Sequence, residues 1–212
     1  SISYQWNRAG TAISGATSST YTLVQADVGS AITVTASYTD GQNTAESSTS
    51  SATGTVANVN DDPTGSVAIS GTATEDQELS ITNTLADEDG LGSFSYVWKR
   101  AGTAISGATS ATYTLVQADV GSTITVTVSY TDGQSTAESA TSAATGTVAN
   151  VNDNPTGSVT ISGTATEDQT LTASNDLADE DGMGTVTYAW SNGATGASIV
   201  LGQSDVGNAI TV

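Results

Sequence analysis

The segment Ile124-Thr125-Val126-Thr127-Val128-Ser129-Tyr130-Thr131 alternates large apolar and small polar side chains along its whole length. Successive side chains of a β-strand point to opposite faces of a sheet, so this pattern places one buried row against one exposed row. The Asp132-Gly133 pair that follows is a turn signal. We therefore expect a half-buried strand at this position and not a helix.

Similar alternating segments surround this one, and each is bounded by a turn that contains glycine. Strands are expected at residues 65–71, 78–85, 93–99, 111–116, 123–131 and 136–149, with a short hairpin at 102–109. About seven short strands in about 92 residues, with a tryptophan on the third, are typical of an immunoglobulin-like Greek-key β-sandwich. The sequence therefore predicts an all-β protein.

The chain repeats itself with a period of 92 residues. Trp6, Trp98 and Trp190 keep this spacing, and residues 10–17 return unchanged at 102–109. A fixed period of this kind is typical of tandem units in a linear array. We expect a partial immunoglobulin-like unit at 1–62 that lacks its first two strands, a complete unit at 63–154, and a partial unit at 155–212 that lacks the end of strand F and strand G.

The composition narrows the possible functions. There are 22 acidic residues against three basic ones, for a net charge of −19. Nucleic acid is an unlikely partner because there is no basic surface to neutralise phosphates, and an anionic membrane surface is disfavoured for the same reason. No apolar run approaches the length of a membrane span, so no membrane insertion is expected. Without cysteine or histidine, disulfides, thiolate metal sites and the usual zinc ligands are excluded.

Two acidic connectors join the expected units. They read Asn58-Val59-Asn60-Asp61-Asp62-Pro63 and Asn150-Val151-Asn152-Asp153-Asn154-Pro155. Proline pushes the residue before it toward extended geometry, and asparagine and aspartate are poor strand formers. Each connector is therefore expected to be short, stiff and rich in oxygen-bearing side chains.

The acidic loops of such sandwiches would converge on the connectors. Carboxylates about 4 Å apart repel by about 4 kcal/mol at an effective dielectric constant near 20, so a cation is expected between them. Calcium takes roughly six to eight oxygen ligands from carboxylates and carbonyls, whereas magnesium demands a tighter octahedron. We therefore expect Ca²⁺ to bind at the connectors. The candidate ligands are Asp27, Asn58, Asn60, Asp61, Asp62, Glu75, Asp76, Asp87, Asp89, Asp119, Asp132, Asn150, Asn152, Asp153, Asn154, Asp179 and Asp181.

The connector pattern Asn-x-Asn-Asp-(Asp/Asn)-Pro resembles the calcium-binding linker of cadherins. That resemblance implies a ligand set at the second connector made of Glu75, Asp119, Asn152, Asp153, Asp179 and Asp181. The chain departs from the cadherin pattern in two places. The connector begins with Asn instead of Asp, and the acidic motif at the exit end of the unit differs, which leaves the number of ions per connector open.

The whole repeat more closely resembles the tandem immunoglobulin-like repeats of giant bacterial surface adhesins of the RTX and biofilm-associated type. The shared runs are Ser-Tyr-x-Trp, Ile-Ser-Gly-Ala-Thr, Ala-Asp-Val-Gly and Ser-Tyr-Thr-Asp-Gly. This resemblance covers the entire chain. It implies that the chain is an extender and that the binding domains lie elsewhere in the protein.

Several of these residues also have a simpler explanation. Acidic loops often only confer solubility, and Asp27 could equally form a plain corner between strands. The three tryptophans are expected in the core, because a sugar-stacking platform would need them exposed. The pair Asp179 and Asp181 could suggest a glycosidase, but adjacent loop acids recur with every repeat, so we expect no enzyme.

Two functional hypotheses follow. In the first, the chain is a structural extender of a bacterial cell-surface adhesin or extracellular filament, stiffened by calcium at its joints. Its partners would be neighbouring repeats, or copies of itself end to end, joined by strand complementation. In the second, a sandwich face or loop tip binds a glycan or a protein ligand. Both hypotheses place the chain outside the cell or at the bacterial surface.

Overall fold

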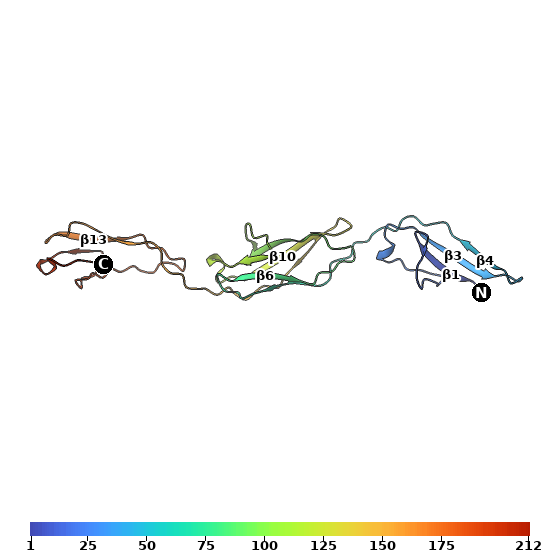
Figure 1. Ribbon diagram of the computed structural model, residues 1–212, viewed down its shortest axis with the longest axis horizontal. Helices are drawn as coiled ribbons and strands as arrows, with labels where there is room; N and C mark the ends of the chain where they lie inside the picture. The colour runs from blue at the N-terminus through green and yellow to red at the C-terminus, as the bar shows by residue number, and fades with distance from the viewer. The chain divides into compact units, whose positions relative to one another are not determined.

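The computed structural model describes all of residues 1–212 and is all-β, with several antiparallel sheets (Figure 1). The chain divides into two compact units, each assembled from separate segments. Unit 1 comprises Ser1–Ser70, Ser80–Tyr113 and Ile124–Thr145, and unit 2 comprises Gly71–Leu79, Thr114–Thr123 and Gly146–Val212. None of the helices has the length and apolar character that crossing a membrane requires. The domain boundaries expected from the repeat remain a prediction.

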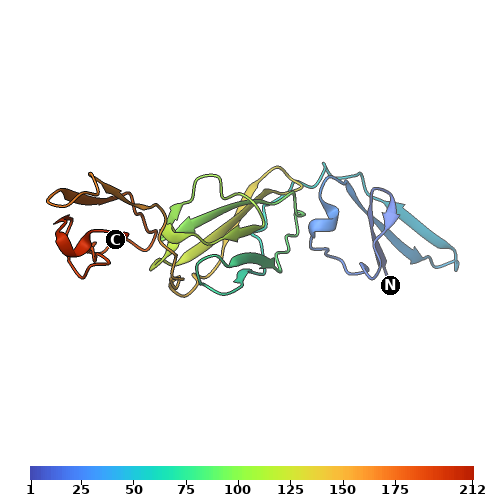
Figure 2. The same ribbon diagram turned by 60° about the vertical axis from the view of Figure 1, so that its left-hand side comes forward.

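Unit 1 contains two four-stranded sheets. The first has the order β2-β1-β3-β4, and β1, β3 and β4 lie side by side in both ribbon views (Figures 1 and 2). Its strands are β1 (Ser3–Arg8), β2 (Thr11–Ala12), β3 (Ile32–Thr39) and β4 (Ala45–Thr49). The second has the order β11-β10-β7-β8. Its strands are β7 (Ser95–Arg100), β8 (Thr103–Ala104), β10 (Ile124–Thr131) and β11 (Ala137–Thr141).

Two three-stranded sheets complete the fold, with the orders β5-β6-β9 and β12-β13-β14. The first consists of β5 (Val67–Ser70), β6 (Glu78–Asn83) and β9 (Thr112–Thr114), and β6 and β9 contribute residues to both units. The second lies in unit 2 and consists of β12 (Val159–Ser162), β13 (Thr170–Asn175) and β14 (Ser198–Val200). Three short 3₁₀ turns are η1 (Gln25–Asp27), η2 (Gln117–Asp119) and η3 (Gln203–Asp205).

The alternation predicted for residues 124–131 is confirmed by the burial of β10. Ile124, Val126 and Val128 are fully buried, Tyr130 is nearly so, and the polar residues between them are half-exposed. β10 pairs with β7 so that Val126 lies opposite Trp98, which is also fully buried. Residues 92 positions earlier pair in the same register, with Val34 opposite Trp6. The repeated sequence therefore gives the same strand pairing in both sheets of unit 1.

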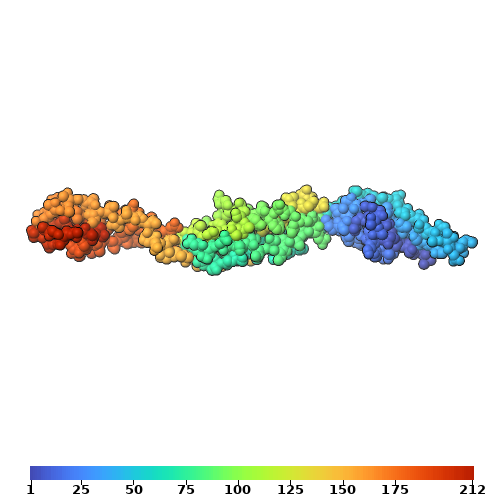
Figure 3. Space-filling view, viewed as in Figure 1, coloured from blue at the N-terminus to red at the C-terminus, as the bar shows by residue number.

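Unit 2 has its own apolar cluster around β13. Leu171, Ala173, Trp190, Ile199 and Leu201 are buried together. The C-terminal residues Ile210 and Val212 pack against this cluster. In the space-filling view the red C-terminal segment accordingly lies against the orange β12–β13 segment (Figure 3). The third tryptophan is thus a core residue, as the sequence predicts.

Some expected strands are shorter than predicted or interrupted. The strand expected at 136–149 ends at Thr141, and Val148 and Ala149 form separate parallel bridges with Val120 and Thr74. In the segment 102–109, where a short hairpin was expected, the two residues of β8 pair antiparallel with the end of β7. Beyond Thr141 the segment still donates to the carbonyls of Val126 and Ile124, but the side-chain oxygens of Ser142 and Thr145 replace backbone carbonyls as acceptors, so the regular antiparallel ladder ends there. Periodicity alone does not reveal this change of partner.

Gly92 lies where two backbone segments approach very closely. A Cβ atom at this position would come within 2.0 Å of the carbonyl oxygen of Thr131. We expect Gly92→Ala to destabilise the fold by about 1–3 kcal/mol, because the backbone must move apart to admit the methyl group. Gly146→Ala is the matched control, since a Cβ there meets nothing within 4 Å. Thermal unfolding followed by circular dichroism measures both, and equal melting temperatures for the two variants would refute the close approach.

Candidate metal centres

Two groups of three acidic residues bring their carboxylate oxygens within 4.8 Å of one another, and each could hold a metal ion. The first group, called cluster 1, is Asp87, Asp89 and Asp132, all in unit 1. The second group, called cluster 2, is Glu75, Asp153 and Asp181, all in unit 2. All six residues are among the ligands predicted from the sequence.

Asp132 in cluster 1 is held by the turn that follows β10. Its Oδ1 accepts the N–H groups of Gln134 (2.9 Å) and Thr136 (2.7 Å), which fixes the side chain within its own turn. Its Oδ2 is buried and accepts no hydrogen bond. The residue as a whole is only 6% exposed. A buried carboxylate oxygen without a donor is costly, so this atom needs a ligand that the protein itself does not supply.

Asp87 and Asp89 lie on the loop between β6 and β7 and complete cluster 1. Asp87 accepts the N–H of Asp89 at 2.8 Å through Oδ1 and the Tyr130 hydroxyl at 2.6 Å through Oδ2. The N–H of Gly133 donates to the carbonyl of Asp89 at 3.0 Å, so this loop is tied to the turn of Asp132. Burial, together with the hydrogen bond to Asp87 and the surrounding negative charge, raises the pKa of Tyr130 well above its ordinary value.

Asp89 receives one donor from the first connector and one from η1. Its Oδ2 accepts the N–H of Asp61 at 2.9 Å, and its Oδ1 accepts the Gln25 amide at 2.6 Å. The hydrogen bond from the Asp61 backbone lowers the pKa of Asp89, since it outweighs the effect of burial, and the Asn58 and Gln25 amides add to it. Asp89 is therefore held as a carboxylate next to Asp132.

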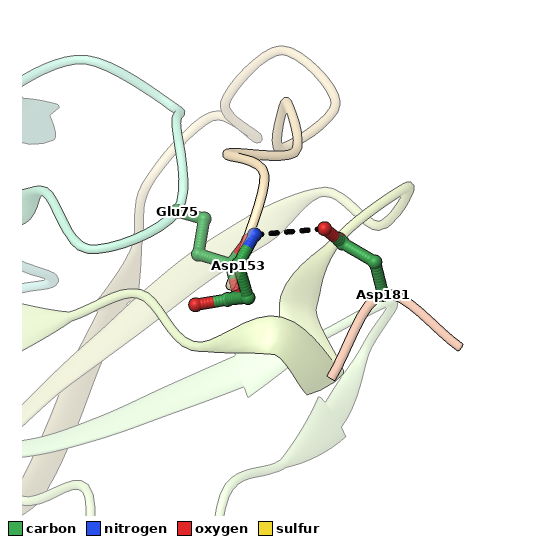
Figure 4. A group of neighbouring side chains, drawn as sticks. All are labelled: Glu75, Asp153 and Asp181. Carbon is green, nitrogen blue, oxygen red and sulfur yellow. Dashed lines mark hydrogen bonds between the residues drawn. The ribbon is translucent and has the colours of Figure 1, made fainter. Parts of the chain in front are cut away.

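Cluster 2 draws its three acids from three separate segments (Figure 4). Asp181 accepts the N–H of Asp153 at 2.8 Å, the contact drawn as a dashed line, and the amide of Asn150 at 2.6 Å. Glu75 is buried and accepts the N–H of Val151 at 3.2 Å. With its amide nitrogen turned toward these acceptors, Gln117 donates to Glu75 at 2.7 and 2.9 Å. Asp153 and Asp181 are more exposed than Glu75, so cluster 2 is the more open of the two.

The same connector contact occurs in both units. Asp61 donates its N–H to Asp89, and 92 residues later Asp153 donates its N–H to Asp181. Because these bonds use the backbone N–H, the side chains of Asp61 and Asp153 take no part in them and can turn toward a cation. Gln25 and Gln117 also occupy equivalent positions, and both donate to an acidic residue of a cluster. These glutamines are not among the ligands predicted from the sequence. The available signal was their place two residues before Asp27 and Asp119 in the repeated Gln-Ala-Asp-Val-Gly run.

Asp27 and Asp119, both predicted from the sequence as ligands, lie outside the two clusters. Asp27 is fully buried, and its carboxylate accepts hydrogen bonds from Arg8 (2.7 Å), Tyr21 (3.0 Å) and the N–H of Val24 (2.9 Å). Asp119 is equally buried and accepts the N–H of Val116 at 2.9 Å. Each of these acids closes its own 3₁₀ turn, which is the corner role that the sequence left open for Asp27.

The remaining predicted ligands are placed around the clusters without being part of them. Asn58 accepts from Gln25 at 3.3 Å, Asn60 donates to Glu138 at 2.9 Å, and Asn152 donates to the carbonyl of Asp153 at 2.9 Å. Asp179 accepts the N–H of Asp181 at 3.0 Å, the same loop bond that Asp87 makes with Asp89. The exposed members are Asn60, Asp61, Asp62, Asp76, Asn152 and Asn154.

The buried Asp27 should make the stability of unit 1 depend on pH. Burial alone would raise the pKa of Asp27, but the hydrogen bonds from Val24, Arg8 and Tyr21 outweigh it and hold this pKa below its ordinary value. The stabilisation is then complete above the unfolded pKa of about 3.9 and is lost as the pH falls through the lower folded value. Asp27→Asn should destabilise by about 1–3 kcal/mol at pH 7, and the difference from wild type should shrink below about pH 4. Urea unfolding at several pH values measures it.

Asp205→Asn is the matched control for this experiment. Asp205 closes η3 in the same way, accepting the N–H of Gly202 at 2.9 Å, but its side-chain donor is the neutral amide of Asn192 in place of an arginine. We expect a smaller loss at pH 7 for this variant. Equal losses for the two variants, or a gap between Asp27→Asn and wild type that stays constant down to pH 3, would contradict the role given to the Arg8–Asp27 pair.

No model of a known protein family matches the chain, and no curated protein sequence matches it.

Proposed function

We propose that the chain is a structural extender of a bacterial cell-surface adhesin or extracellular filament, and that calcium at its connectors stiffens it. The observation that carries this proposal is the buried Oδ2 of Asp132, which has no hydrogen-bond donor and lies among the carboxylates of Asp87 and Asp89. Three mutually close carboxylates with one unpaired buried oxygen form an arrangement that a cation would stabilise.

Calcium fits the donors better than other common metals. The clusters offer carboxylates, with asparagine and glutamine amides beside them, and the chain has no histidine or cysteine to favour zinc or copper. Oxygen-only donors that come from irregular loops and a connector suit the variable geometry of calcium. Magnesium keeps several waters and prefers a strict octahedron, which these loops do not specify.

The extender role is supported by repetition at the level of contacts. The Trp–Val pairing of the sheets and the Asp–Asp contact of the connectors each occur twice at a spacing of 92 residues. We propose that the units are tandem immunoglobulin-like sandwiches, each of which contacts only its neighbours, and that copies join end to end. A receptor site need not be copied in every unit, whereas a joint must be, so repetition of the connector favours the extender over an adhesion module.

Calorimetric titration of residues 1–212 with CaCl₂, alongside small-angle scattering with calcium and with excess chelator, tests the proposal. We expect calcium to bind and to raise the melting temperature. In chelator the scattering curve should require an ensemble of conformations, whereas in calcium one rigid conformation should fit it. Magnesium at the same concentration serves as the control and should have a smaller effect. Identical melting and scattering in calcium and in chelator would mean that the acids only confer solubility. That result would favour the alternative hypothesis, in which the chain binds a glycan or a protein.

A further inference from the structure

Tyr130 is the last buried residue of β10 and connects the apolar core of its sheet to cluster 1. It is only 4% exposed, and its ring meets that of Phe94 edge-on, with the ring centroids 5.7 Å apart. Its hydroxyl donates to Oδ2 of Asp87 at 2.6 Å. A buried tyrosine hydroxyl usually finds a hydrogen-bond partner. Here that partner is one of the candidate metal ligands.

Asp87 is held at both of its carboxylate oxygens. Oδ1 accepts the N–H of Asp89 at 2.8 Å, a bond within one loop, whereas Oδ2 accepts the Tyr130 hydroxyl, which belongs to a strand of the sheet. The two donors together fix the plane of the carboxylate. Each carboxylate oxygen can accept more than one bond, so Asp87 keeps the capacity to bind a cation in this fixed orientation.

Repulsion between like charges acts on Asp87 in the opposite direction. Its carboxylate offers an oxygen within 4.8 Å of oxygens of both Asp89 and Asp132, and carboxylates at such distances repel one another. Asp87 is the least buried of the three acids, so it is the one that can turn toward water. The Tyr130 hydroxyl opposes this movement, because a hydrogen bond to a carboxylate is charge-assisted and stronger than a neutral one.

The run Ser-Tyr-Thr-Asp-Gly at residues 129–133 brings two parts of this arrangement together. Tyr130 precedes Asp132 by two residues, the spacing at which side chains of an extended segment lie on the same side. Asp132 supplies the buried Oδ2 that has no donor, and Tyr130 orients the acid next to it. One short run therefore contributes a ligand and the group that orients a second ligand.

We propose that Tyr130 is a positioning residue of cluster 1, whose hydroxyl holds Asp87 in the orientation that binds a cation together with Asp89 and Asp132. This inference rests on the calcium binding proposed above and adds a residue that does not touch the ion. Groups that orient metal ligands in this way typically change metal affinity by roughly 10–100-fold when they are removed.

Tyr130→Phe tests the proposal, because it removes the hydroxyl and keeps the buried ring. Calorimetric titration with CaCl₂ should show an affinity lower than wild type by about tenfold or more. Tyr96→Phe is the matched control. Tyr96 lies on β7, which pairs with β10, and its hydroxyl bonds to none of the acids of cluster 1. Its calcium affinity should equal that of wild type. Cluster 2 is unchanged in every variant, so a difference between titrations reports cluster 1.

A double-mutant cycle with Asp87→Asn distinguishes positioning from a merely structural role. If the hydroxyl acts through Asp87, Tyr130→Phe should reduce calcium affinity strongly in wild type and only slightly in the Asp87→Asn background. A hydroxyl with a purely structural role would lower the melting temperature equally in calcium and in chelator, and would leave the calcium affinity unchanged. Circular dichroism melts in chelator measure that loss of stability and verify that each variant folds.

Terbium luminescence supplies a spectroscopic signature. Tb³⁺ binds at oxygen sites that suit calcium, and its emission is excited through an aromatic ring close to the ion. At saturating Tb³⁺ the emission excited through tyrosine should fall in Tyr130→Phe and stay unchanged in Tyr96→Phe. Added calcium should displace the Tb³⁺. Equal emission from the two variants would place the ion away from Tyr130 and overturn the proposal.

The possible failures are distinguishable. A wild-type chain that binds neither calcium nor Tb³⁺ would refute the proposed function, and this inference with it. A wild-type chain that binds calcium while Tyr130→Phe binds it equally well or more tightly would overturn this inference alone, because the hydroxyl would then be irrelevant or compete with the ion. Unchanged affinity in Asp87→Asn would also overturn it, since there would be no ligand to position.

Discussion

Asp132→Asn should stabilise the protein in chelator and weaken its binding of calcium. In the metal-free protein the Oδ2 of Asp132 is buried without a donor, close to the carboxylates of Asp87 and Asp89. An asparagine amide at the same place removes one negative charge and can donate to either neighbour, so the free energy of unfolding should rise by about 1 kcal/mol or more. The retained Oδ1 can still accept from Gln134 and Thr136.

In calcium the same change removes a charged ligand. Affinity of oxygen sites for calcium follows the number of charged ligands, and we expect a loss of about tenfold or more, equivalent to about 1.4 kcal/mol of binding free energy. The variant should therefore be more stable than wild type in chelator and gain less from calcium. Thermal melts across a calcium titration display both effects in one data set.

Asp40→Asn provides the matched control. Asp40 occupies the position 92 residues before Asp132, and its Oδ1 accepts the N–H groups of Gln42 and Thr44, both at 2.8 Å, in the same kind of turn. It belongs to neither acidic cluster. Its substitution should leave calcium binding unchanged. If Asp40→Asn and Asp132→Asn behaved alike in calcium and in chelator, cluster 1 would not be a metal site.

Trp98→Ala should cost about 3–5 kcal/mol of stability, the range found for removing a fully buried tryptophan. The side chain is completely buried, its indole N–H donates to the carbonyl of Ser110 at 2.9 Å, and its ring lies 5.7 Å from that of Tyr113. Truncation would leave a cavity and an unpaired carbonyl in the centre of the sheet packing. Guanidinium unfolding followed by far-ultraviolet circular dichroism measures the loss.

Trp6→Ala is the natural comparison. Trp6 makes the same indole bond, to Ser18 at 2.9 Å, and its ring lies 5.8 Å from Tyr21, but it is only partly buried. We expect less than half the loss of Trp98→Ala, because water already reaches the site and the cavity term is small. Equal losses would mean that burial differs less between the two positions than the structure indicates.

The strands could be predicted from sequence wherever one face is buried. Residues 124–131 alternate because one side of β10 packs in the core, and this prediction was accurate to one residue. The parallel bridges of Val148 and Ala149 could not be predicted, because a single valine carries no periodicity. Which strand it joins depends on the chain leaving its ladder at Ser142, and that depends on tertiary packing.

The acids of the clusters were predicted from their loops, and the same reasoning predicted Asp27 and Asp119 as ligands, which the structure places in 3₁₀ turns outside the clusters. A sequence shows that a carboxylate is present but not what lies opposite it. Asp27 faces Arg8 and Tyr21, whose distance in sequence hides the contact, while Asp132 faces two other acids. The residue types alone could not separate an acid that is already satisfied from one that still needs a partner.

The separation in sequence of the acids in each cluster sets an order of assembly during synthesis. Cluster 1 is complete once residue 132 has left the ribosome, whereas cluster 2 joins Glu75 to Asp181 and must wait for 49 further residues. A chain that emerges from its N-terminus would therefore complete cluster 1 before cluster 2. If the chain is the exported extender proposed above, the joint completed last would be the last to bind calcium, and the part of the molecule exported first would become rigid first.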